Sequence, residues 1–379
     1  MKKIALVFFD AGGGHRSAAT ALDLVIRRQQ RPWTVELFNL QEALDGIDPL
    51  RRVSGLRVQD FYNLLLAKGW TLGSPQMLRV LQGAIRLGHR HAVRLLERQW
   101  ARIQPDLVVS LVPHFNRALF ESFARARPGA PFATVLTDFA DYPPHFWIEP
   151  QPQFFICGSE RAAGQARSMG HPPERVFLTS GMILHPRFYE PVEADRVSER
   201  RRLGLSPELP TGVVLFGGHG SSVMLEIADR LSRSEVAAQL IMICGRNESL
   251  AHALRHSPAK IPMFIEGFTQ KVPYYMHLAD FFIGKPGPGS LSEAFAMNLP
   301  VIVESNAWTL PQERYNAEWV REKQVGIVLR SFRKIVPAVT EMIQPANLAR
   351  YRQNASAIQN RAVFEIPDML ARILEISAR

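Results

Sequence analysis

The sequence predicts an α/β protein made of two doubly wound domains, each built around a parallel sheet. Short runs rich in Val, Ile, Leu and Phe alternate with segments of helix length along the whole chain. Runs that are apolar on both faces are typical of parallel strands covered by helices on two sides. These runs fall into two series, and a chain of 379 residues that is 46% hydrophobic is long enough to bury two cores.

The expected strands follow one another in two groups. The first group comprises 3–9, 106–112, 132–139 and 153–158, and the second comprises 212–218, 240–245, 263–268, 280–285 and 300–305. Prolines and charges replace the apolar rhythm at 185–212, so we place residues 1–184 in one domain and residues 185–379 in the other. Open α/β sheets bind ligands at the carboxyl edges of their strands, so we expect a site between the two domains.

Cysteine usage and hydropathy indicate the compartment. Cys157 and Cys244 each lie in an apolar strand-like run, which predicts buried free thiols of a reducing compartment such as the cytoplasm. The first apolar run is too short for a signal peptide, and no run approaches the roughly 20 apolar residues of a spanning helix. We therefore expect a protein that is soluble or attached to a membrane surface.

The formal net charge of +10 favours an anionic partner. Nucleic acid, anionic lipid and phosphorylated substrates all meet that requirement. No zinc finger, helix-turn-helix or RNA-recognition signature occurs, and the aromatic residues are mostly Phe inside apolar runs, which argues against nucleic acid.

Three glycine-bearing loops follow expected strands, namely DAGGGH at 10–15, FGGHGSS at 216–222 and GKPGPGSLSEA at 284–294. Glycine lets the backbone approach a ligand closely, and a helix start behind it offers unpaired amides to an anion such as a diphosphate. One such loop is equally well explained by a tight turn, but three in two domains favour ligand binding. No Walker motif, dinucleotide motif or metal-ligand spacing is present, so we expect no cofactor and no metal.

The third loop leads into a helix whose early turns carry Ser290, Ser292 and Glu293. A carboxylate beside a cluster of amides is suited to accept hydrogen bonds from a ribose diol while the amides hold a phosphate. The alternative is that Glu293 interacts only with the helix dipole.

The motifs in their order resemble the GT-B glycosyltransferases that include monogalactosyldiacylglycerol synthases, bacterial diacylglycerol glucosyltransferases and, more distantly, the peptidoglycan enzyme that adds N-acetylglucosamine to lipid I. The matching pieces are DAGGGHRSAA, TVLTDFADYPPHFW, GGHG, ICGRNESL, the long block from EGFTQ to PVIV, and PQERYNAEWV. They cover nearly the whole chain, and the long block is the most specific. The resemblance implies two Rossmann-like domains facing each other across a cleft, the first for the acceptor and the membrane and the second for a UDP-sugar. In related folds the last helix can pack back on the first domain.

The resemblance also implies a set of donor-binding residues. Glu293 would hold the ribose, and the backbone at Gly267, Phe268 and Thr269 would meet the uracil. The diphosphate would bind at Gly218 and at Gly287, Pro288, Gly289 and Ser290. Gln312, Glu313 and Asn316 match a polar cluster of the family in which the first two positions face the sugar hydroxyls.

One segment departs from the family pattern. The family often carries GLPVRP where this chain has GMILHP, so His185 stands near the place of an arginine that contacts the donor phosphates. Either Arg187 replaces that arginine from a shifted position, or a neutral His185 leaves phosphate binding to amides alone.

His15 in the first glycine loop is the expected base or acceptor-positioning residue. Its unperturbed pKa of about 6.5 suits proton removal near neutral pH. Gly12, Gly13 and Gly14 would keep side chains out of the acceptor's path. The alternative for His15 is a helix-capping or structural role.

Two further residues belong to the acceptor side. Asp138 ends an expected strand and is the second candidate, as a base, as a group that orients His15, or as a turn cap. His114 also follows an expected strand.

Arginines four residues apart at 76–103 predict a cationic helix stripe, formed by Arg86, Arg90, Arg94, Arg98 and Arg102. Apolar residues lie beside it, namely Leu78, Leu81, Ile85, Leu95, Leu96 and Trp100. Such a helix can lie on an anionic membrane, and we expect its arginines and Trp100 to contact the lipid. The alternative is an ordinary amphipathic helix whose arginines face water.

The sequence as a whole favours an inverting glycosyltransferase that moves a hexose from UDP-glucose or UDP-galactose to diacylglycerol. It would act at the cytoplasmic face of the cell membrane as a peripheral protein bound to anionic lipids. The alternatives are another lipid acceptor, a non-hydrolysing UDP-sugar epimerase, and a degenerate protein that binds UDP-sugars or anionic lipids. Gln312 and Glu313 can serve either sugar epimer, so the donor stays undecided.

Overall fold

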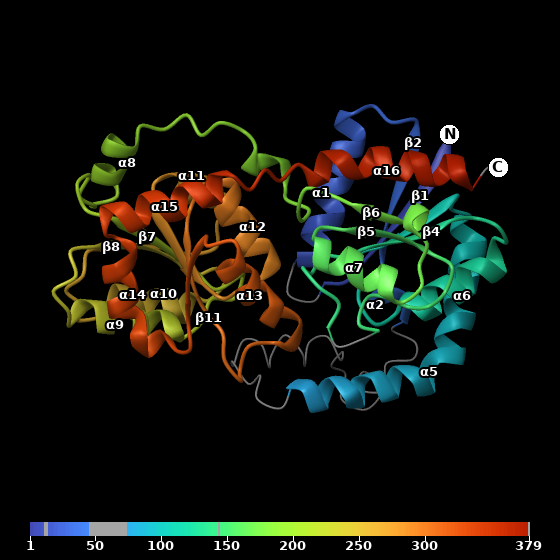
Figure 1. The fold of residues 1–379 in the computed structure, drawn as a ribbon, viewed down its shortest axis with the longest axis horizontal. Coiled ribbons are helices and arrows are strands. Elements are labelled where there is room, and N and C mark those ends of the chain that lie inside the picture. The colour runs from blue at the N-terminus through green and yellow to red at the C-terminus, as the bar shows by residue number, and fades with distance from the viewer. Residues whose placement is uncertain (11–13, 45–73, 143–144, 378–379) are drawn as a thin grey trace. The chain divides into compact units, whose positions relative to one another are not determined.

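The computed structural model describes residues 1–377 with the exception of 11–13, 45–73 and 143–144 (Figure 1). The described residues divide into two compact units. One unit extends to Pro186 and includes the segment from Asn360 onward, and the other is Arg187–Gln359. The division therefore follows Pro186 instead of Leu184, and the C-terminal segment belongs to the first unit.

The first unit contains a parallel sheet with strand order β2-β1-β3-β4-β5-β6. Its strands are β1 (Lys2–Phe8), β2 (Trp33–Asn39), β3 (Leu107–Ser110), β4 (Phe132–Val135), β5 (Phe154–Cys157) and β6 (Val176–Leu178). Its helices are α1 (Gly14–Arg28), α2 (Leu40–Leu44), α5 (Ser74–Ile103), α6 (Asn116–Ala126), α7 (Glu160–Ser168), η2 (Pro173–Arg175) and α16 (Ala362–Ile376). The strand order reverses direction between β1 and β3, so the loops after these two strands lie at the topological switch point.

Helix α16 packs against α1 in the first unit. Ile366, Leu370 and Ile373 belong to the same buried cluster as residues of β1 and α1. Gln29 Nε2 donates to the Phe364 carbonyl (3.1 Å), and Ser180 Oγ donates to Glu365 Oε1 (2.7 Å). The segment after the second unit is therefore part of the core of the first.

The second unit contains a parallel sheet with strand order β12-β11-β10-β7-β8-β9. Its strands are β7 (Thr211–Leu215), β8 (Gln239–Ile243), β9 (Met263–Glu266), β10 (Phe281–Gly284), β11 (Val301–Glu304) and β12 (Gly326–Leu329). Its helices are α8 (Arg196–Arg202), α9 (Val223–Ser232), α10 (Glu248–Arg255), α11 (Val272–His277), α12 (Pro288–Ala296), η4 (Pro311–Glu313), α13 (Arg314–Glu322), η5 (Phe332–Lys334), α14 (Ile335–Met342) and α15 (Pro345–Ser356), with η3 (Pro186–Phe188) at the junction of the units. Here the switch point lies between β7 and β10, as in dinucleotide-binding folds.

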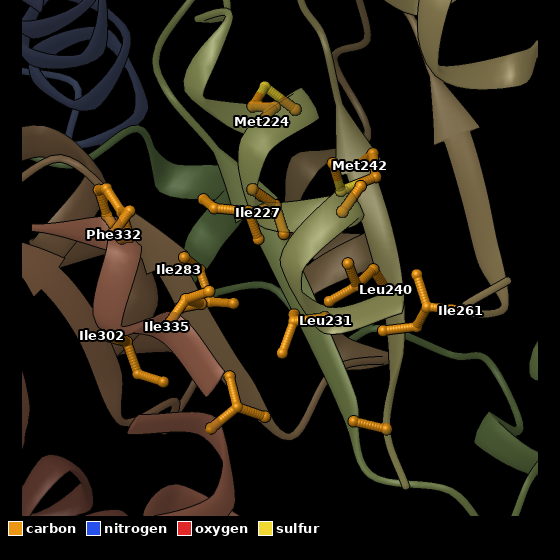
Figure 2. Close-up of a cluster of buried hydrophobic side chains, with 14 of the residues drawn as sticks. Met224, Ile227, Leu231, Leu240, Met242, Ile261, Ile283, Ile302, Phe332 and Ile335 are labelled. Atoms are coloured by element: carbon orange, nitrogen blue, oxygen red, sulfur yellow. The ribbon is translucent and has the colours of Figure 1, made fainter. Parts of the chain in front are cut away.

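The core of the second unit lies between its sheet and the helices that cover one face. Met224, Ile227 and Leu231 of α9 meet Leu240 and Met242 of β8 (Figure 2). The two parallel sheets confirm the predicted class of two doubly wound domains, and their strands β3, β4, β5, β7, β8 and β10 are buried along their whole length. Cys157 and Cys244 are buried free thiols, as predicted.

A buried ion-pair network joins α8 to the sheet of the second unit. Asp280, just before β10, accepts hydrogen bonds from Arg200 Nη2 (2.7 Å), Arg196 Nη2 (2.8 Å) and the Thr211 backbone amide (2.9 Å). The Arg200 side chain is only 7% exposed. The charge-rich stretch at the predicted domain boundary is thus anchored at the amino ends of β7 and β10.

Candidate functional site

His15 lies at the switch point of the first sheet. It is the second residue of α1, directly after the loop that follows β1. Its Nδ1 lies 3.3 Å from Thr137 Oγ1, and the ring also hydrogen-bonds the backbone of Leu111, the first residue after β3. The ring centroid is 6.0 Å from that of Trp147. The imidazole is therefore anchored by the loops after two neighbouring strands.

Burial keeps the His15 ring neutral. Desolvation lowers the pKa of His15 to about 4, although the hydrogen bond to Leu111 opposes this shift. The ring is thus neutral at pH 7 and has a lone pair for a proton, although a pKa of about 4 lies below the value of about 6.5 on which the predicted base role rested. Gly12 and Gly13 lie outside the described residues, and Gly14 begins α1 as an exposed residue with open space around it.

Asp138 and His15 both lie against the indole ring of Trp147. Trp147 Nε1 donates to Asp138 Oδ2 (2.8 Å), and the Trp147 backbone amide donates to Asp141 Oδ1 (2.7 Å). Both carboxylates are buried, and desolvation raises the pKa of Asp141 to about 6 despite its hydrogen bonds from the backbone. This arrangement favours the orienting role among the three considered for Asp138, because Asp138 holds the indole that lies beside His15.

His114 follows β3 on the same edge of the sheet. Its backbone has a positive φ of 66°, and its ring centroid is 4.2 Å from that of Phe146. Desolvation lowers the pKa of His114 to about 4, and its buried Nδ1 has no hydrogen-bond partner among the described residues. His114 is therefore a second neutral imidazole near the switch point.

In the second unit the glycine loop after β7 contacts the loop after β8. The Arg246 amide donates to the Gly218 carbonyl (2.9 Å), and a Cβ on Gly245 would lie 2.4 Å from that oxygen, so only glycine fits there. Gly218 itself is exposed and has open space around it.

The start of α12 leaves backbone amides unpaired. The first helical hydrogen bond runs from the Leu291 amide to the Gly287 carbonyl (3.0 Å), so the Gly289 and Ser290 amides come before the helical hydrogen-bond pattern. These amides are available to an anion.

Glu293 lies one turn further into α12 and is half-buried. Desolvation raises the pKa of Glu293 to about 7, and the charge of Arg187 lowers it in opposition. Arg187 Nη1 donates to the Gln270 carbonyl (3.0 Å). His185 belongs to the first unit and Arg187 to the second. The two candidates for the cationic phosphate contact are therefore divided between the units.

The predicted base-binding segment lines a pocket of about 740 Å³. Gly267 and Phe268 form one side of this pocket, and the loop from Gly245 into α10 forms the other. Phe268 is 58% exposed, with the Arg246 guanidinium 4.8 Å from its ring centroid. An exposed aromatic ring paired with a cation is suited to stack with a planar heterocycle. Thr269 follows and accepts a hydrogen bond from the Lys271 amide (3.0 Å).

The predicted polar cluster of Gln312, Glu313 and Asn316 lies at the start of α13. Asn316 is fully buried and its Nδ2 donates to the Pro286 carbonyl (2.8 Å), so it positions the glycine loop. Gln312 Oε1 is buried with no hydrogen-bond partner among the described residues. Glu313 Oε1 lies 3.0 Å from Lys285 Nζ. The sequence analysis missed Lys285, although a cation directly after a strand and before GPG was a usable signal.

Helix α5 carries the predicted arginine stripe, with one correction. Arg86, Arg90, Arg94, Arg98 and Arg102 are all exposed, and Leu87 between them is 91% exposed. Trp100 is instead fully buried, with Nε1 donating to Ser122 Oγ (2.8 Å) and its ring 4.8 Å from that of Phe38. The prediction that Trp100 contacts the membrane is therefore wrong, because Trp100 shares the inner helix face of Leu96. Leu78 and Leu81 lie outside the residues whose side chains are described.

Comparison with known proteins decides the family. The chain is 30% identical over 388 residues to monogalactosyldiacylglycerol synthase 2 of Arabidopsis thaliana, an alignment that covers 96% of this chain and 79% of that protein. This chain belongs to the monogalactosyldiacylglycerol synthase family of glycosyltransferases. Residues 213–372 also match the glycosyltransferase family 28 C-terminal domain.

Solved structures confirm the architecture of this family member. Acinetobacter baumannii MurG superimposes with a TM-score of 0.63 at 12% identity, covering 98% of this chain and all of that one. UDP-GlcNAc 2-epimerase from Neisseria meningitidis, bound to UDP-GlcNAc, gives a TM-score of 0.58 at 13% identity and covers 98% of this chain and 100% of that one. The synthase-family chain thus has the predicted GT-B fold. Within its described residues, no group of three or more His, Cys, Asp and Glu side chains is placed to hold a metal ion.

Proposed function

We propose that this protein transfers a hexose from UDP-glucose or UDP-galactose to diacylglycerol, with inversion at the anomeric carbon. A relative that aligns with 96% of the chain is named a monogalactosyldiacylglycerol synthase, and a protein of the same fold was solved with UDP-GlcNAc. The observation that carries the proposal is that each sheet presents one half of the required chemistry at its switch point. The first presents an anchored neutral imidazole, and the second presents a half-buried carboxylate behind free amides.

The transfer requires one proton acceptor and one site for negative charge. His15 takes the proton of the acceptor hydroxyl as its oxygen forms a bond to the anomeric carbon. The bond from that carbon to the β-phosphate oxygen breaks, and its electron pair leaves with UDP. The amides of the Gly218 loop and of the first turn of α12 stabilise the charge that grows there. Glu293 holds the ribose diol, for which its carboxylate must be ionised.

The exposed arginines of α5 supply the attachment to the membrane. Each arginine near an anionic surface contributes about 1 kcal/mol, so the stripe is sufficient for reversible binding at the cytoplasmic face. The exposed Leu87 lies within the stripe and can enter the lipid layer. No helix in the described part of the chain combines the length and apolarity needed to cross a membrane.

The proposed reaction is tested with vesicles that contain diacylglycerol and anionic lipid, mixed with the protein and with each UDP-sugar in turn. We expect a monohexosyl diacylglycerol and an equal amount of UDP from one of the two donors. The variant with Arg90, Arg94 and Arg98 all replaced by glutamate should lose most of this product on vesicles. It should keep the activity in detergent micelles, where no anionic surface is needed.

Other outcomes of this assay identify the rival functions. Conversion of one UDP-sugar into another without lipid would show an epimerase. UDP release that depends on a different lipid extract would show another acceptor. If neither donor is consumed under any condition, the proposed function is wrong.

A further inference from the structure

Lys285 is the first residue after β10 and lies close to the glycine loop that follows β7. Gly284, the last residue of β10, lies so close to β7 that a Cβ there would be 2.4 Å from the Leu215 carbonyl oxygen. The Cε atom of Lys285 lies 3.9 Å from the Cβ position of Gly217 and 3.4 Å from that of Gly287. The lysine therefore stands between the loops that follow β7 and β10, at the switch point of the sheet.

A nearly buried carboxylate holds this lysine in place. Lys285 Nζ lies 3.0 Å from Glu313 Oε1, and the side chains are 39% and 10% exposed, respectively. The lysine thus keeps an open side while its partner is enclosed. Because an ammonium group has three N–H donors, it can keep its bond to Glu313 and reach a second anion at the same time. Asn316 Nδ2 donates to the carbonyl of Pro286 (2.8 Å), which fixes the backbone directly after Lys285.

We propose that Lys285 is the cation that binds the donor diphosphate and that Glu313 aims it there. This inference rests on the proposed function, because it presumes a UDP-sugar in the second unit. The ammonium group of Lys285 contacts both the Glu313 carboxylate and a β-phosphate oxygen. It thereby links the carboxylate that is expected to face the sugar to the negative charge of the leaving group. As the glycosidic bond breaks and its electron pair moves to the β-phosphate, the attraction to Lys285 increases. The leaving phosphate therefore needs no proton.

With this assignment, Lys285 supplies the positive charge that an arginine in the segment 181–186 often supplies in the family. Arg187 is engaged by the Gln270 carbonyl (3.0 Å) and acts on Glu293, which places it on the ribose side of the donor. Lys285 lies beside the loops whose amides receive the phosphates. The positive charge is thus supplied from the end of β10 instead of from the segment that joins the units.

The test compares Lys285→Met, Lys285→Arg and the matched control Lys323→Met, a surface lysine at the other end of α13. We expect Lys285→Met to lower kcat by about 10²-fold, as for removal of one preorganised donor at a developing charge. It should also weaken UDP binding and shift the ³¹P resonance of the β-phosphate of bound UDP. Lys285→Arg should restore most of the activity, and Lys323→Met should match the wild type in all three measurements.

The outcomes separate this inference from the proposed function. If the wild type binds UDP and a folded Lys285→Met variant matches it in UDP affinity, kcat and ³¹P shift, the role of Lys285 is refuted while the proposed function stands. A wild type that does not bind UDP refutes both. Should Lys285→Met fail to fold because Glu313 is left unpaired, the double variant Lys285→Met/Glu313→Gln removes both charges and must show the same loss of UDP affinity.

Discussion

Replacing His15 by alanine is expected to lower kcat for glycosyl transfer by about 10²–10⁴-fold, the usual contribution of a positioned general base. The imidazole is held by Thr137 and Leu111 and is kept neutral by burial, so its removal leaves the acceptor hydroxyl without a proton acceptor. Apart from His185, the predicted donor-binding side chains belong to the second unit. Affinity for the UDP-sugar, measured by calorimetry, should therefore stay close to that of the wild type.

Asp138→Asn is the control that assigns the base. Asparagine keeps a side-chain oxygen that can accept the hydrogen bond from Trp147 Nε1, so the indole beside His15 stays in place. If Asp138 orients the site, this variant should retain most of its kcat. A kcat of His15→Ala near the wild-type value, together with a large loss in Asp138→Asn, would transfer the role of base to Asp138.

Replacing Asp280 by alanine is expected to destabilise the protein by about 3–5 kcal/mol, because it leaves the buried guanidinium of Arg200 without its carboxylate partner. The same change removes the acceptor of the Thr211 amide (2.9 Å) at the start of β7. Thermal or urea unfolding of the purified variant measures the effect.

Glu226→Gln provides the matched comparison for Asp280. Glu226 pairs with Arg230 one turn along α9, and both side chains are more than a third exposed. Loss of such a surface pair is expected to change stability by about 0.5 kcal/mol or less. Equal effects of the two substitutions would show that the network around Asp280 does not anchor α8.

The interior strands were predictable, and three edge strands were missed. β3, β5, β7, β8 and β10 are buried along their whole length, and each appears in the sequence as a continuous apolar run. β2, β6 and β12 form edges of the two sheets and are only partly buried. The sequences WTVELFN and GIVL therefore do not stand out as continuous apolar runs, which is the signal of a buried strand. The 132–139 run also ends as a strand at Val135, which leaves Thr137 and Asp138 in a loop at the site.

The site was predictable where a residue belongs to a local motif, and not where long-range packing decides. His15, Gly218 and Glu293 follow strands or begin helices, so their place at the carboxyl edges could be read from the order of elements. Trp100 has apolar and cationic neighbours at helical spacing, and only its contacts with Phe38 and Ser122 show that it faces inward. Lys285 could have been noticed directly after an apolar run, but its place beside Gly217 depends on the pairing of β7 with β10, which are far apart in the sequence.

Donor binding measured against pH tests the central claim most directly, namely that the second unit holds a UDP-sugar through the Glu293 carboxylate. Burial raises the pKa of Glu293 to about 7, so the ionised form that accepts the ribose hydroxyls is lost as the pH falls through that value. Affinity for UDP-glucose or UDP-galactose should therefore be about tenfold weaker at about pH 6 than at about pH 8. The diphosphate of a UDP-sugar does not titrate in this range. Glu293→Gln should bind weakly at both pH values, and Glu318→Gln, on the exposed face of α13, should behave like the wild type. Tight binding of either donor by Glu293→Gln, or no binding by the wild type, would contradict the claim.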